Sequence, residues 1–595
     1  MKIAIFFWIL LGVWAWGDSN VTSQAPESTK EIIIQGNHAI ETSEYLDALG
    51  VKQKSWFAFW GDDKTTIAKK IIPTIADTMR QFLDSKGYYD AKISVKNNPK
   101  QIKITVDEDK PVMVSDLQVD TDFNIPPVAA FKKGTRFEAA KFVRIKQEIK
   151  ALLMKAGYCN YQLDTKAYVD LVKRTVSLKY VLKKGALCYF GETRIVSKPD
   201  NISEKVILSR LRYKKGEVFS TEKISRTFSA LNNLDAFGSG TVAPKDQEEE
   251  EDEEEETHKA PRSVIPMEVS LSPKEKFNLF KGGIGYDTAL GMRLQLYYER
   301  RNFMGEARKF TSKLHYSEKS KYGELTLFSP ALIALNGDYF DFYTELGFSH
   351  TIYDAYNENK GYLRAKLTYE RDDITVALGV GVENIDIEKT AVDPAIIEGN
   401  FLLLYPFASF VYDGRDSKIN PKNGYYFSAY TEYGVDYEPG ASSYYKFLLE
   451  GRLIKTFDKL TLAVVGKVGV LDELSNQVPA SKLFYAGGAY SNRAYGEHAI
   501  GAITSAVASS ALGGKTWLNF SVEANYPLYG DLFGALFFDS TMINKESYDF
   551  KGETINAAGL GLRYITPIGP IKVDIGANIE DVDQYGISFQ IGQSF

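Results

Sequence analysis

The spacing of hydrophobic residues changes near the middle of the chain. Before about residue 273, segments with apolar residues at every third or fourth position alternate with short segments in which every second residue is apolar. From Phe277 to Phe595 the period is two almost throughout. The first spacing is typical of amphipathic helices, and the second is typical of strands whose two faces meet different surroundings. The sequence therefore predicts an α+β amino-terminal half followed by an all-β half.

The amino-terminal half repeats one order of elements three times, namely a strand, two helices and two further strands. The segments with the clearest helical spacing are residues 65–85, 139–155 and 221–234. The main strands expected around them are residues 32–34, 91–95, 101–106, 112–119, 175–182 and 264–271. A Gly-Tyr pair follows the first two helical segments, at 87–88 and 157–158. Repetition of this order predicts three related domains.

The carboxy-terminal half alternates between apolar and polar residues along segments of strand length. In residues 292–299 every second side chain is apolar and the others are polar or charged, and residues 363–370 show the same alternation. A soluble antiparallel sandwich with one face in water would also produce this pattern. Two features favour a membrane barrel: more than 300 residues pass without a convincing helix, and aromatic residues gather toward the strand ends.

The length of this half predicts the number of strands. A membrane-spanning strand needs about 10 residues, or roughly 20 with its share of the loops. The 319 residues from 277 to 595 therefore predict sixteen strands, an even number. The expected fold is three α+β domains followed by a sixteen-stranded antiparallel transmembrane β-barrel.

The first residues, 1–17, have the features of an export signal. Lys2 gives a short positive region, residues 3–16 are apolar, and Ala15 and Gly17 are small at the positions that a signal peptidase inspects. We expect cleavage after Gly17. A permanent anchor is the alternative, but it needs about 20 apolar residues and this stretch is shorter.

Charge and composition argue against several classes of function. The formal net charge of −6 depends on an unbroken run of nine acidic residues at 248–256, and without it the net charge would be +3, so no nucleic-acid surface is expected. We expect this run to be a solvated loop, with a docking site for a basic partner as the alternative. The five His and two Cys are scattered, and no Gly-rich phosphate-binding loop occurs. We therefore expect no metal, no cofactor and no enzymatic chemistry.

The first repeat carries the sequence Gly-Tyr-Tyr-Asp-Ala at 87–91, and this resembles the helix-to-strand junction of POTRA domains. The motif is reduced to Gly-Tyr-Cys-Asn at 157–160 and to Asp-Ala-Phe at 235–237. The resemblance implies POTRA domains at residues 28–109, 110–185 and 186–274, with an acidic loop at 247–257 in the third, and a barrel at 275–595.

Four blocks in the second half together resemble the BamA and TamA superfamily of outer-membrane assembly proteins. They are an Asp-x-Arg-Asp strand end, a Gly-Gly loop with an Arg-x-aromatic motif, two strands that follow it, and a Gly-rich penultimate-strand signature. The residues that carry them include Asp413, Arg415, Asp416, Gly487, Gly488, Arg493, Tyr495, Glu523, Asp539, Gly559, Gly561, Pro567, Gly569 and Pro570. Three POTRA-like units rather than five make the chain most similar to the TamA branch.

The same alternation predicts a lumenal site. It turns Glu523 and Asp539 toward the inside of the barrel. The resemblance implies that Arg493 lies in a long extracellular loop that folds back into the barrel and pairs with both carboxylates. The alternative is that these carboxylates are only wetted lumen residues. The family motif has Gly where this chain has Ala494, and Ala would cost about 1 kcal/mol there if the position needs a positive φ.

Two further sets of residues carry predictions. Phe589, Ile591 and the final Phe595 share one face of the last strand, which resembles the terminal signal by which bacterial outer-membrane barrels are recognised. Cys159 opens the hairpin of the second unit and Cys188 begins the third unit. Antiparallel pairing places Cys159 beside the end of the partner strand near Leu182, and Cys188 lies six residues further on, so a bond is permitted but not enforced. Because export also leads to an oxidising compartment, we expect a disulfide, with two free thiols as the alternative.

The resemblance implies a non-enzymatic assembly factor in the bacterial outer membrane, with its POTRA arm in the periplasm. It would receive unfolded outer-membrane proteins or autotransporters by strand addition and release them into the outer-membrane lipids through a lateral gate between its first and last strands. A TamB-like partner anchored in the inner membrane is also implied. The alternatives are a passive outer-membrane channel, which leaves the periplasmic units idle, and a two-partner secretion transporter, which has fewer modules.

Overall fold

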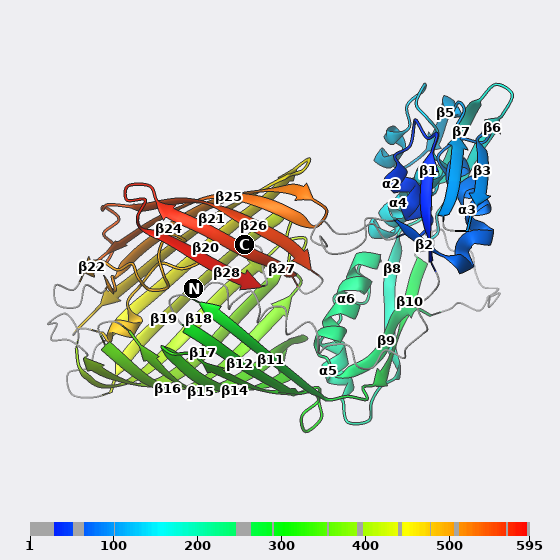
Figure 1. The fold of residues 1–595 in the computed structure, drawn as a ribbon. Coiled ribbons are helices and arrows are strands. Elements are labelled where there is room, and N and C mark those ends of the chain that lie inside the picture. Colours follow the sequence, from blue (N-terminus) through cyan, green and yellow to red (C-terminus); the bar gives the residue numbers. More distant parts are fainter. Residues whose placement is uncertain are drawn as a thin grey trace, which may run out of the picture. The chain divides into compact units, whose positions relative to one another are not determined.

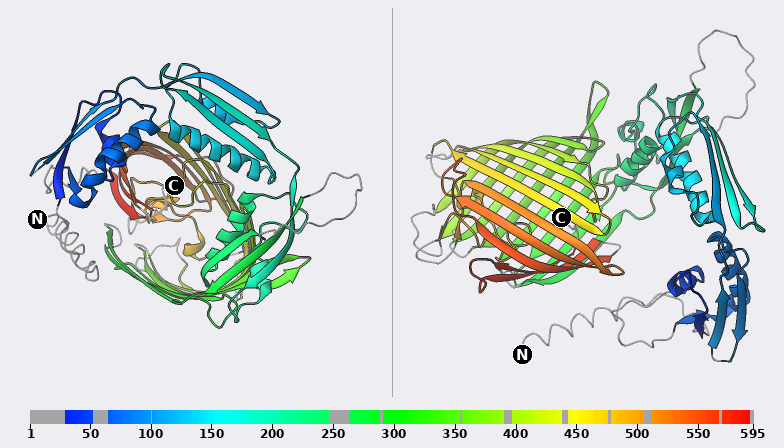
Figure 2. Two further views of the ribbon diagram at one scale, coloured as in Figure 1. Left: turned by 90° about the vertical axis from the view of Figure 1, so that its right-hand side faces the viewer. Right: turned by 90° about the horizontal axis from the view of Figure 1, so that it is seen from above.

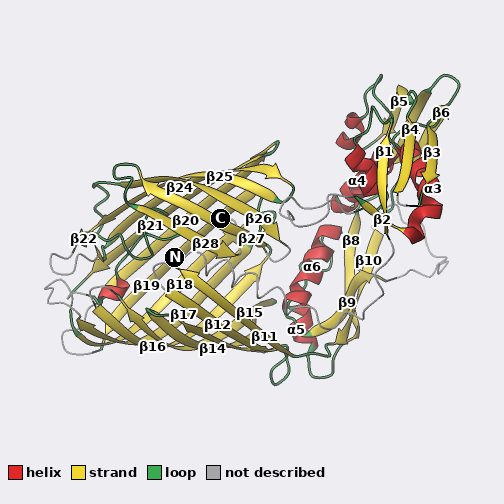
Figure 3. Cartoon of the chain, viewed as in Figure 1, coloured by secondary structure: helices red, strands yellow, loops and turns green. Residues whose placement is uncertain are grey.

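The computed structural model describes residues 29–51, 65–99, 101–245, 263–287, 291–353, 356–389, 397–437, 443–475, 478–504, 511–566 and 569–591. The predicted signal peptide at 1–17, the acidic run at 248–256 and Phe595 lie outside these residues. The chain divides into two compact units, one formed mainly by residues up to Cys188 and the other by the residues that follow, including the barrel. Figure 1 labels the elements, and Figure 3 distinguishes helices from strands by colour; in the described part, the α-helices precede the barrel strands along the chain.

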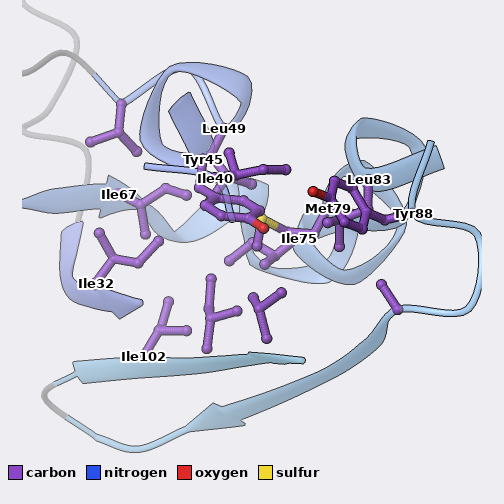
Figure 4. Packing of buried hydrophobic residues seen from close by; sticks show 14 residues of the cluster. Ile32, Ile40, Tyr45, Leu49, Ile67, Ile75, Met79, Leu83, Tyr88 and Ile102 are labelled. Carbon is purple, nitrogen blue, oxygen red and sulfur yellow. The ribbon is translucent and has the colours of Figure 1, made fainter. Parts of the chain in front are cut away.

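The first module packs two helices against a four-stranded sheet. Its elements are β1 (Thr29–Gln35), α2 (Thr42–Ala48), β2 (Thr66–Ala68), the 3-10 helix η2 (Lys69–Thr74), α3 (Ile75–Ser85), β3 (Lys92–Asn97) and β4 (Gln101–Asp107). The strand order is β2-β1-β4-β3, with β1 parallel to β4. Tyr45 and Met79 on the helices meet Ile32 and Ile102 on the sheet (Figure 4), so burial of these apolar faces holds the module together.

The prediction of a helix over residues 65–85 is wrong for the first half of that segment. Thr66–Ala68 forms the edge strand β2, and the α-helix begins only at Ile75. Pro73 has no backbone N–H and its ring clashes with the preceding turn of an α-helix, which explains why the intervening residues form η2 instead. Ile67 contributed to the apparent helical spacing, but it is buried in the core from a strand.

The second module contains β5 (Met113–Thr121), the 3-10 helix η3 (Pro126–Ala130), α4 (Ala139–Lys155), β6 (Gln162–Asp170) and β7 (Thr175–Lys183). The central strand β7 is parallel to β5 and antiparallel to β6. The helix predicted at 139–155 is confirmed, and its residues Ile145, Ile149 and Leu153 are buried. The other helix expected in this module is only the five-residue turn η3.

The two Gly-Tyr pairs have a structural reason. Gly87 and Gly157 end α3 and α4 with φ of 88° and 92°, a conformation that glycine adopts without strain. A Cβ on Gly87 would lie 2.1 Å from the carbonyl oxygen of Phe137, so this position excludes any side chain. The motif therefore provides a left-handed helix end in both modules and, at Gly87, a close passage of the chain.

Cys159 and Cys188 are joined by a disulfide, with their Cα atoms 5.9 Å apart. The backbone N–H of Cys188 donates a hydrogen bond of 2.9 Å to the carbonyl of Gly157. The covalent link therefore ties the end of α4 to the first residue of β8 (Cys188–Ser197), where the third module begins.

The third module belongs to the same compact unit as the barrel. After β8 it contains α5 (Glu204–Leu208), α6 (Thr221–Asn233), β9 (Phe237–Pro244) and β10 (Ser263–Pro273), and the strand order is β8-β10-β9. The helix predicted at 221–234 and the strand predicted at 264–271 are confirmed, apart from one or two residues at their ends.

Sixteen strands of the described residues form one antiparallel sheet, as predicted, in the order in which they follow along the chain. They are β11 (Asn278–Asp287), β12 (Gly291–Arg300), β13 (Lys309–Tyr316), β14 (Ser320–Leu335), β15 (Asp338–Ile352), β16 (Tyr356–Arg371), β17 (Ile374–Lys389), β18 (Gly399–Asp413), β19 (Gly424–Asp436), β20 (Tyr444–Phe457), β21 (Leu460–Glu473), β24 (Thr516–Tyr529), β25 (Leu532–Asn544), β26 (Ile555–Thr566), β27 (Gly569–Asn578) and β28 (Tyr585–Ile591). The left view of Figure 2 shows the sheet curving into a ring. Most connections at one end are tight turns, such as the two residues between β14 and β15, and those at the other end are mostly longer.

Side chains alternate between the outer and inner faces of the barrel wall. On β17, Leu378, Val380 and Val382 point outward and are 63%, 53% and 38% exposed, whereas Glu383 on the inner face is 1% exposed. An apolar outer face is what contact with lipid requires.

Near the end of the barrel with the longer loops, the outward-facing residues become polar and the inward-facing residues become apolar. Beyond Val382 the outward residues of β17 are the polar Asn384 and Asp386, and the inward residues are the buried Ile385 and Ile387. Similar inward residues of neighbouring strands join a buried apolar cluster, which comprises Tyr356, Ile385, Ile387, Phe401, Leu403, Tyr444, Leu471, Val478, Ala480, Phe484 and Leu512. The strands therefore extend beyond the apolar band and enclose a core of their own.

A buried ion pair joins the third module to the tight-turn end of the barrel. Both guanidinium Nη atoms of Arg210 donate to the carboxylate of Asp341 at 3.0 and 2.7 Å, and both side chains are less than 10% exposed. Apolar residues of the module, including Ile202 and Leu231, share one cluster with Ala331 of β14. Because this contact excludes water, the third module and the barrel pack as one body.

No helix among the described residues is long and apolar enough to cross a membrane.

Replacement of both cysteines by serine should destabilise the unit that contains the first two modules. The disulfide spans 29 positions of sequence, and release of such a loop in the unfolded chain costs about 3 to 4 kcal/mol of stability in the chain-entropy model. Urea-dependent proteolysis of the arm in the full-length protein measures this change. Thiol labelling of the denatured, unreduced wild type should find no reactive cysteine, and two labelled cysteines per chain would contradict the bond.

Candidate functional site

The connection between β21 and β24 folds back inside the barrel. Residues 474–515 contain the 3-10 helix η4 (Ala480–Lys482) and the short strands β22 (Ile503–Thr504) and β23 (Ala511–Leu512). Segments of this connection lie within the ring of strands in the left view of Figure 2. Its residues Phe484 and Leu512 enter the apolar cluster described above, and its charged residues meet the polar inner wall.

Arg493 from this loop contacts both carboxylates that the sequence places on the inner face. Its Nε and Nη2 donate to the two carboxylate oxygens of Asp539 on β25, each at 2.9 Å, and its backbone N–H donates to Asp539 at 3.1 Å. Its Nη1 donates to Glu523 on β24 at 2.6 Å. The guanidinium also stacks on the ring of Phe537, 3.4 Å from the ring centre. This forked geometry suits Arg and not Lys, because a guanidinium is planar and offers several fixed donors.

Two further charged residues, which the sequence analysis did not single out, complete the site. Arg563 on β26 donates to Glu523 at 3.1 Å and pairs with Asp574 on β27 at 2.6 Å. Asp574 also lies 3.8 Å from Arg493. We call Arg493, Glu523, Asp539, Arg563 and Asp574 the Arg493 cluster. Its members are each less than 10% exposed, so every charge depends on its partners rather than on water.

The alternation of residues along β26 could have identified Arg563 as an inward-facing residue. Leu560 and Leu562 are exposed on the outer face of β26, so Arg563 must point inward by alternation. The family-motif residue Gly561 lies beneath the pair of Arg563 and Asp574, because a Cβ there would be 2.1 Å from Asp574 Oδ1.

The glycine pair of the loop motif shapes the turn that presents Arg493. Gly487 and Gly488 have φ of 104° and 81°. A Cβ on Gly487 would lie 2.1 Å from the carbonyl oxygen of Gly496, and the N–H of Gly488 donates to the carbonyl of Tyr495 at 2.9 Å. The loop therefore closes on itself on both sides of Arg493.

Ala494 causes no backbone strain in this loop. Its φ is not among the positive values of the described residues, so the cost considered for an Ala in place of the family Gly does not arise. Its side chain is fully buried. The hydroxyl of the neighbouring Tyr495 accepts a hydrogen bond of 2.8 Å from the Asn578 side chain.

A second charged anchor attaches the same loop to another part of the wall. Lys482, at the end of η4, is 7% exposed, and its amine lies 2.7 Å from Glu383 on β17 and 3.6 Å from Glu432 on β19. The amine also stands 4.6 Å from the centre of the Tyr405 ring. Lys446 on β20 donates to the Lys482 carbonyl at 2.8 Å. The sequence analysis missed this anchor because a lysine in a loop gives no periodic signal.

The other predicted motif residues lie apart from the Arg493 cluster. Arg415 donates to both oxygens of Asp413, and Asp416 accepts the backbone N–H groups of Lys422 and Asn423, so these residues shape the turn between β18 and β19. Gly569 and Pro570 begin β27. Phe589 points outward from β28, and Ile591 ends this strand. Pro567 and Phe595 lie outside the described residues.

Arg493→Ala should free the loop from the inner wall. Removing one partner of a buried ion pair leaves the others uncompensated and costs about 3 to 5 kcal/mol. Limited proteolysis should then cleave within residues 474–515 faster than in the wild type, while the barrel keeps its heat-modifiable mobility on gels. Lys366→Ala is the matched control, because it removes a lumenal ion pair with Glu345 between two neighbouring strands. Equal loop protection in Arg493→Ala and wild type would contradict the anchoring.

Lys482→Met should loosen the other end of the loop, because it keeps most of the aliphatic stem but leaves Glu383 and Glu432 without this cation. We expect the folded barrel to lose about 2 to 4 kcal/mol. The measurement is the thermal midpoint of the heat-modifiable transition. In a double-mutant cycle with Glu432→Gln the two losses should not add, since each removes the same interaction. Strict additivity would show that Lys482 and Glu432 act independently.

The comparisons with known proteins agree with this arrangement. Residues 302–595 match the model of the Omp85 superfamily domain. Residues 28–109 match the POTRA model, described as a surface antigen variable number repeat. Among solved structures, BamA from Haemophilus ducreyi lacking POTRA domains 1–3 is 17% identical, with a TM-score of 0.51, over 81% of this chain and 99% of that one. CdiB from Acinetobacter baumannii is 12% identical, with a TM-score of 0.45, over 81% and 90%.

These matches agree with the resemblance to the BamA and TamA superfamily, while the placement in the TamA branch stays a prediction. The last 294 residues of the chain match the Omp85 model and include most of the barrel. The arm before the barrel begins with a match to the POTRA model. The chain therefore carries an Omp85 superfamily domain over residues 302–595 and a POTRA domain over residues 28–109, with its barrel in the bacterial outer membrane and its POTRA modules in the periplasm.

Proposed function

We propose that this protein assembles other β-barrel proteins or autotransporters into the outer membrane, and that it releases them between its first and last strands. This joint between β11 and β28 is called the seam below. The periplasmic modules receive the unfolded client, and the seam passes its strands into the bilayer. The protein performs no covalent chemistry in this scheme, because burial of a client's apolar face in lipid supplies the driving force.

The seam is the observation that carries the proposal. Among the described residues, β11 pairs only with β12 and β28 pairs only with β27, and no hydrogen-bonded register joins the two. An unpaired strand edge offers its backbone N–H and C=O groups to any added strand.

The arm suits the first step of this function. Each module of the described chain has a mixed or open sheet with free outer edges, such as β3 in the first module and β6 in the second. An extended client segment can add to such an edge through main-chain hydrogen bonds, which do not depend on the client's sequence. This supports broad reception of clients. A TamB-like partner in the inner membrane belongs to the same proposal.

The seam should have to open for clients to pass. A short bifunctional maleimide that joins Lys281→Cys on β11 to Ser588→Cys on β28 should reduce client assembly to background, because the seam can no longer accept strands. Assembly is measured as protease-resistant, heat-modifiable client barrel in proteoliposomes. The native cysteines do not compete for the reagent, because they are joined in the disulfide.

The matched control is the same crosslink between Lys313→Cys and Glu324→Cys, which face each other across the paired strands β13 and β14. It should leave assembly unchanged, as should each single cysteine. Full assembly by the seam-linked protein would contradict the proposed exit. Large, stable and ungated currents in planar bilayers would instead favour a passive channel, and secretion of one soluble partner without barrel assembly would favour a two-partner transporter.

A further inference from the structure

Three glycines form a row on the inner face of the last strands. Gly559 on β26 is the register partner of Gly576 on β27, which is the partner of Gly586 on β28. The side chains next to them along these strands, such as Leu560, Ile575 and Ile587, are exposed on the outer face, so all three glycines face the lumen. We call Gly559, Gly576 and Gly586 the glycine row.

Other groups lie so close to the three glycines that a side chain at any of these positions would clash with them. A Cβ on Gly559 would lie 2.3 Å from the ring of Phe537, which is its partner on β25. A Cβ on Gly576 would lie 3.0 Å from the carbonyl carbon of Arg493, and one on Gly586 would lie 2.6 Å from the carbonyl oxygen of Arg493. The obstructing loop atoms are backbone atoms, which cannot turn aside as a side chain could. The row is therefore a flat surface under Phe537 and residues 493–495, the loop tip.

Two side chains beside the row hold the loop tip from the strand side. The Gln584 side chain, just before β28, donates to the Ala494 carbonyl at 2.9 Å. Asn578, the last residue of β27, donates to the hydroxyl of Tyr495 at 2.8 Å. The loop tip is thus bonded to the wall through Arg493, to Gln584 just before β28 through Ala494, and to the end of β27 through Tyr495.

Aromatic rings cover other wall glycines too, such as Gly381 under Tyr405, but among the described wall glycines only Gly576 and Gly586 have backbone atoms of the loop tip as the nearest atoms to an added Cβ. Gly451 and Gly466 are register partners on the outer face of β20 and β21, and a Cβ on either would meet nothing within 4 Å. A general preference of the barrel for glycine therefore does not explain Gly576 and Gly586. Close approach of another segment is the usual reason for glycine inside a strand, and here the loop tip is that segment.

We propose that the glycine row is a seat for the loop tip, and that the seated tip holds β28, the strand with one paired neighbour, against the barrel wall. Gly576 and Gly586 are therefore positioning residues. The stability of the Arg493 cluster and that of the last strand depend on each other. Detachment of Arg493 then loosens the edge strand, and displacement of the edge strand loosens Arg493. Any effect on the release of clients rests on the function proposed above, whereas the coupling of tip and strand does not.

Reciprocal substitutions test this coupling, because each alters one partner and is read at the other. Arg493→Ala leaves the sequence of β28 unchanged, yet amide hydrogen exchange of residues 585–591 should become about tenfold faster, the size expected from the loss of one or two net hydrogen bonds. Gly586→Ala leaves the loop sequence unchanged, yet exchange at residues 493–495 should rise by a similar factor. Both are measured on the full chain in lipid nanodiscs.

Matched controls separate the seat from general loosening. Gly466→Ala adds the same methyl group on the outer face, and Lys366→Ala removes a lumenal ion pair away from the loop; neither should change exchange at the loop tip or in β28. The double variant Gln584→Ala with Asn578→Ala adds no volume, and it should accelerate exchange at both places even if Gly586→Ala does not assemble.

The outcomes are distinct from those of the seam experiment. Faster exchange of the loop tip in Arg493→Ala with unchanged β28 would overturn the proposal, since the strand would then not depend on the tip. Unchanged exchange at the tip in both Gly586→Ala and the double variant would overturn it as well, since the row would not be a seat. Reciprocal acceleration would establish the coupling even if the seam crosslink left client assembly intact.

Discussion

A β-sheet in a lipid bilayer must pair its backbone N–H and C=O groups within itself, and the described strands of this protein satisfy that requirement at every joint except one. From β11 to β28 each strand is bonded to its neighbours in the chain, while the seam between the first and last strands has no register. An unsatisfied edge in hydrocarbon is costly. The seam is therefore the least stable joint of the wall, and the contacts of the long loop bear directly on it.

The loop remains inside the barrel because buried charges on it have partners only on the wall. Arg493 meets carboxylates of β24 and β25, and Lys482 meets those of β17 and β19. A buried ion pair adds little net stability relative to apolar packing, but separating its members is strongly unfavourable. Such pairs specify one position for the loop. The apolar cluster around Phe484 supplies the packing that the charges do not.

The periplasmic arm contains two kinds of joint. A disulfide connects the second module to the first residue of β8, and a buried contact between Arg210 and Asp341 fixes the third module on the barrel. The second joint includes a buried apolar cluster shared by the third module and the barrel, so the two pack as one body. The third module therefore lies at the tight-turn end of the wall.

The repeated modules, the sixteen strands and the inward direction of Glu523 and Asp539 could be predicted from the amino-acid sequence, because these features follow from local periods of hydrophobicity that each segment carries alone. The same prediction misplaced the start of α3, where Pro73 outweighed the apolar spacing. The contacts of Asp574 with Arg493 and of Arg563 with Glu523, the contact of Lys482 with Glu383, and the alignment of three glycines under Phe537 and the loop tip became visible only in the folded barrel. Alternation gives the face on which a residue lies, but not the residue opposite it. That partner depends on the register and stagger of all strands in the barrel, and on a loop whose path is set by its buried contacts and not by any period.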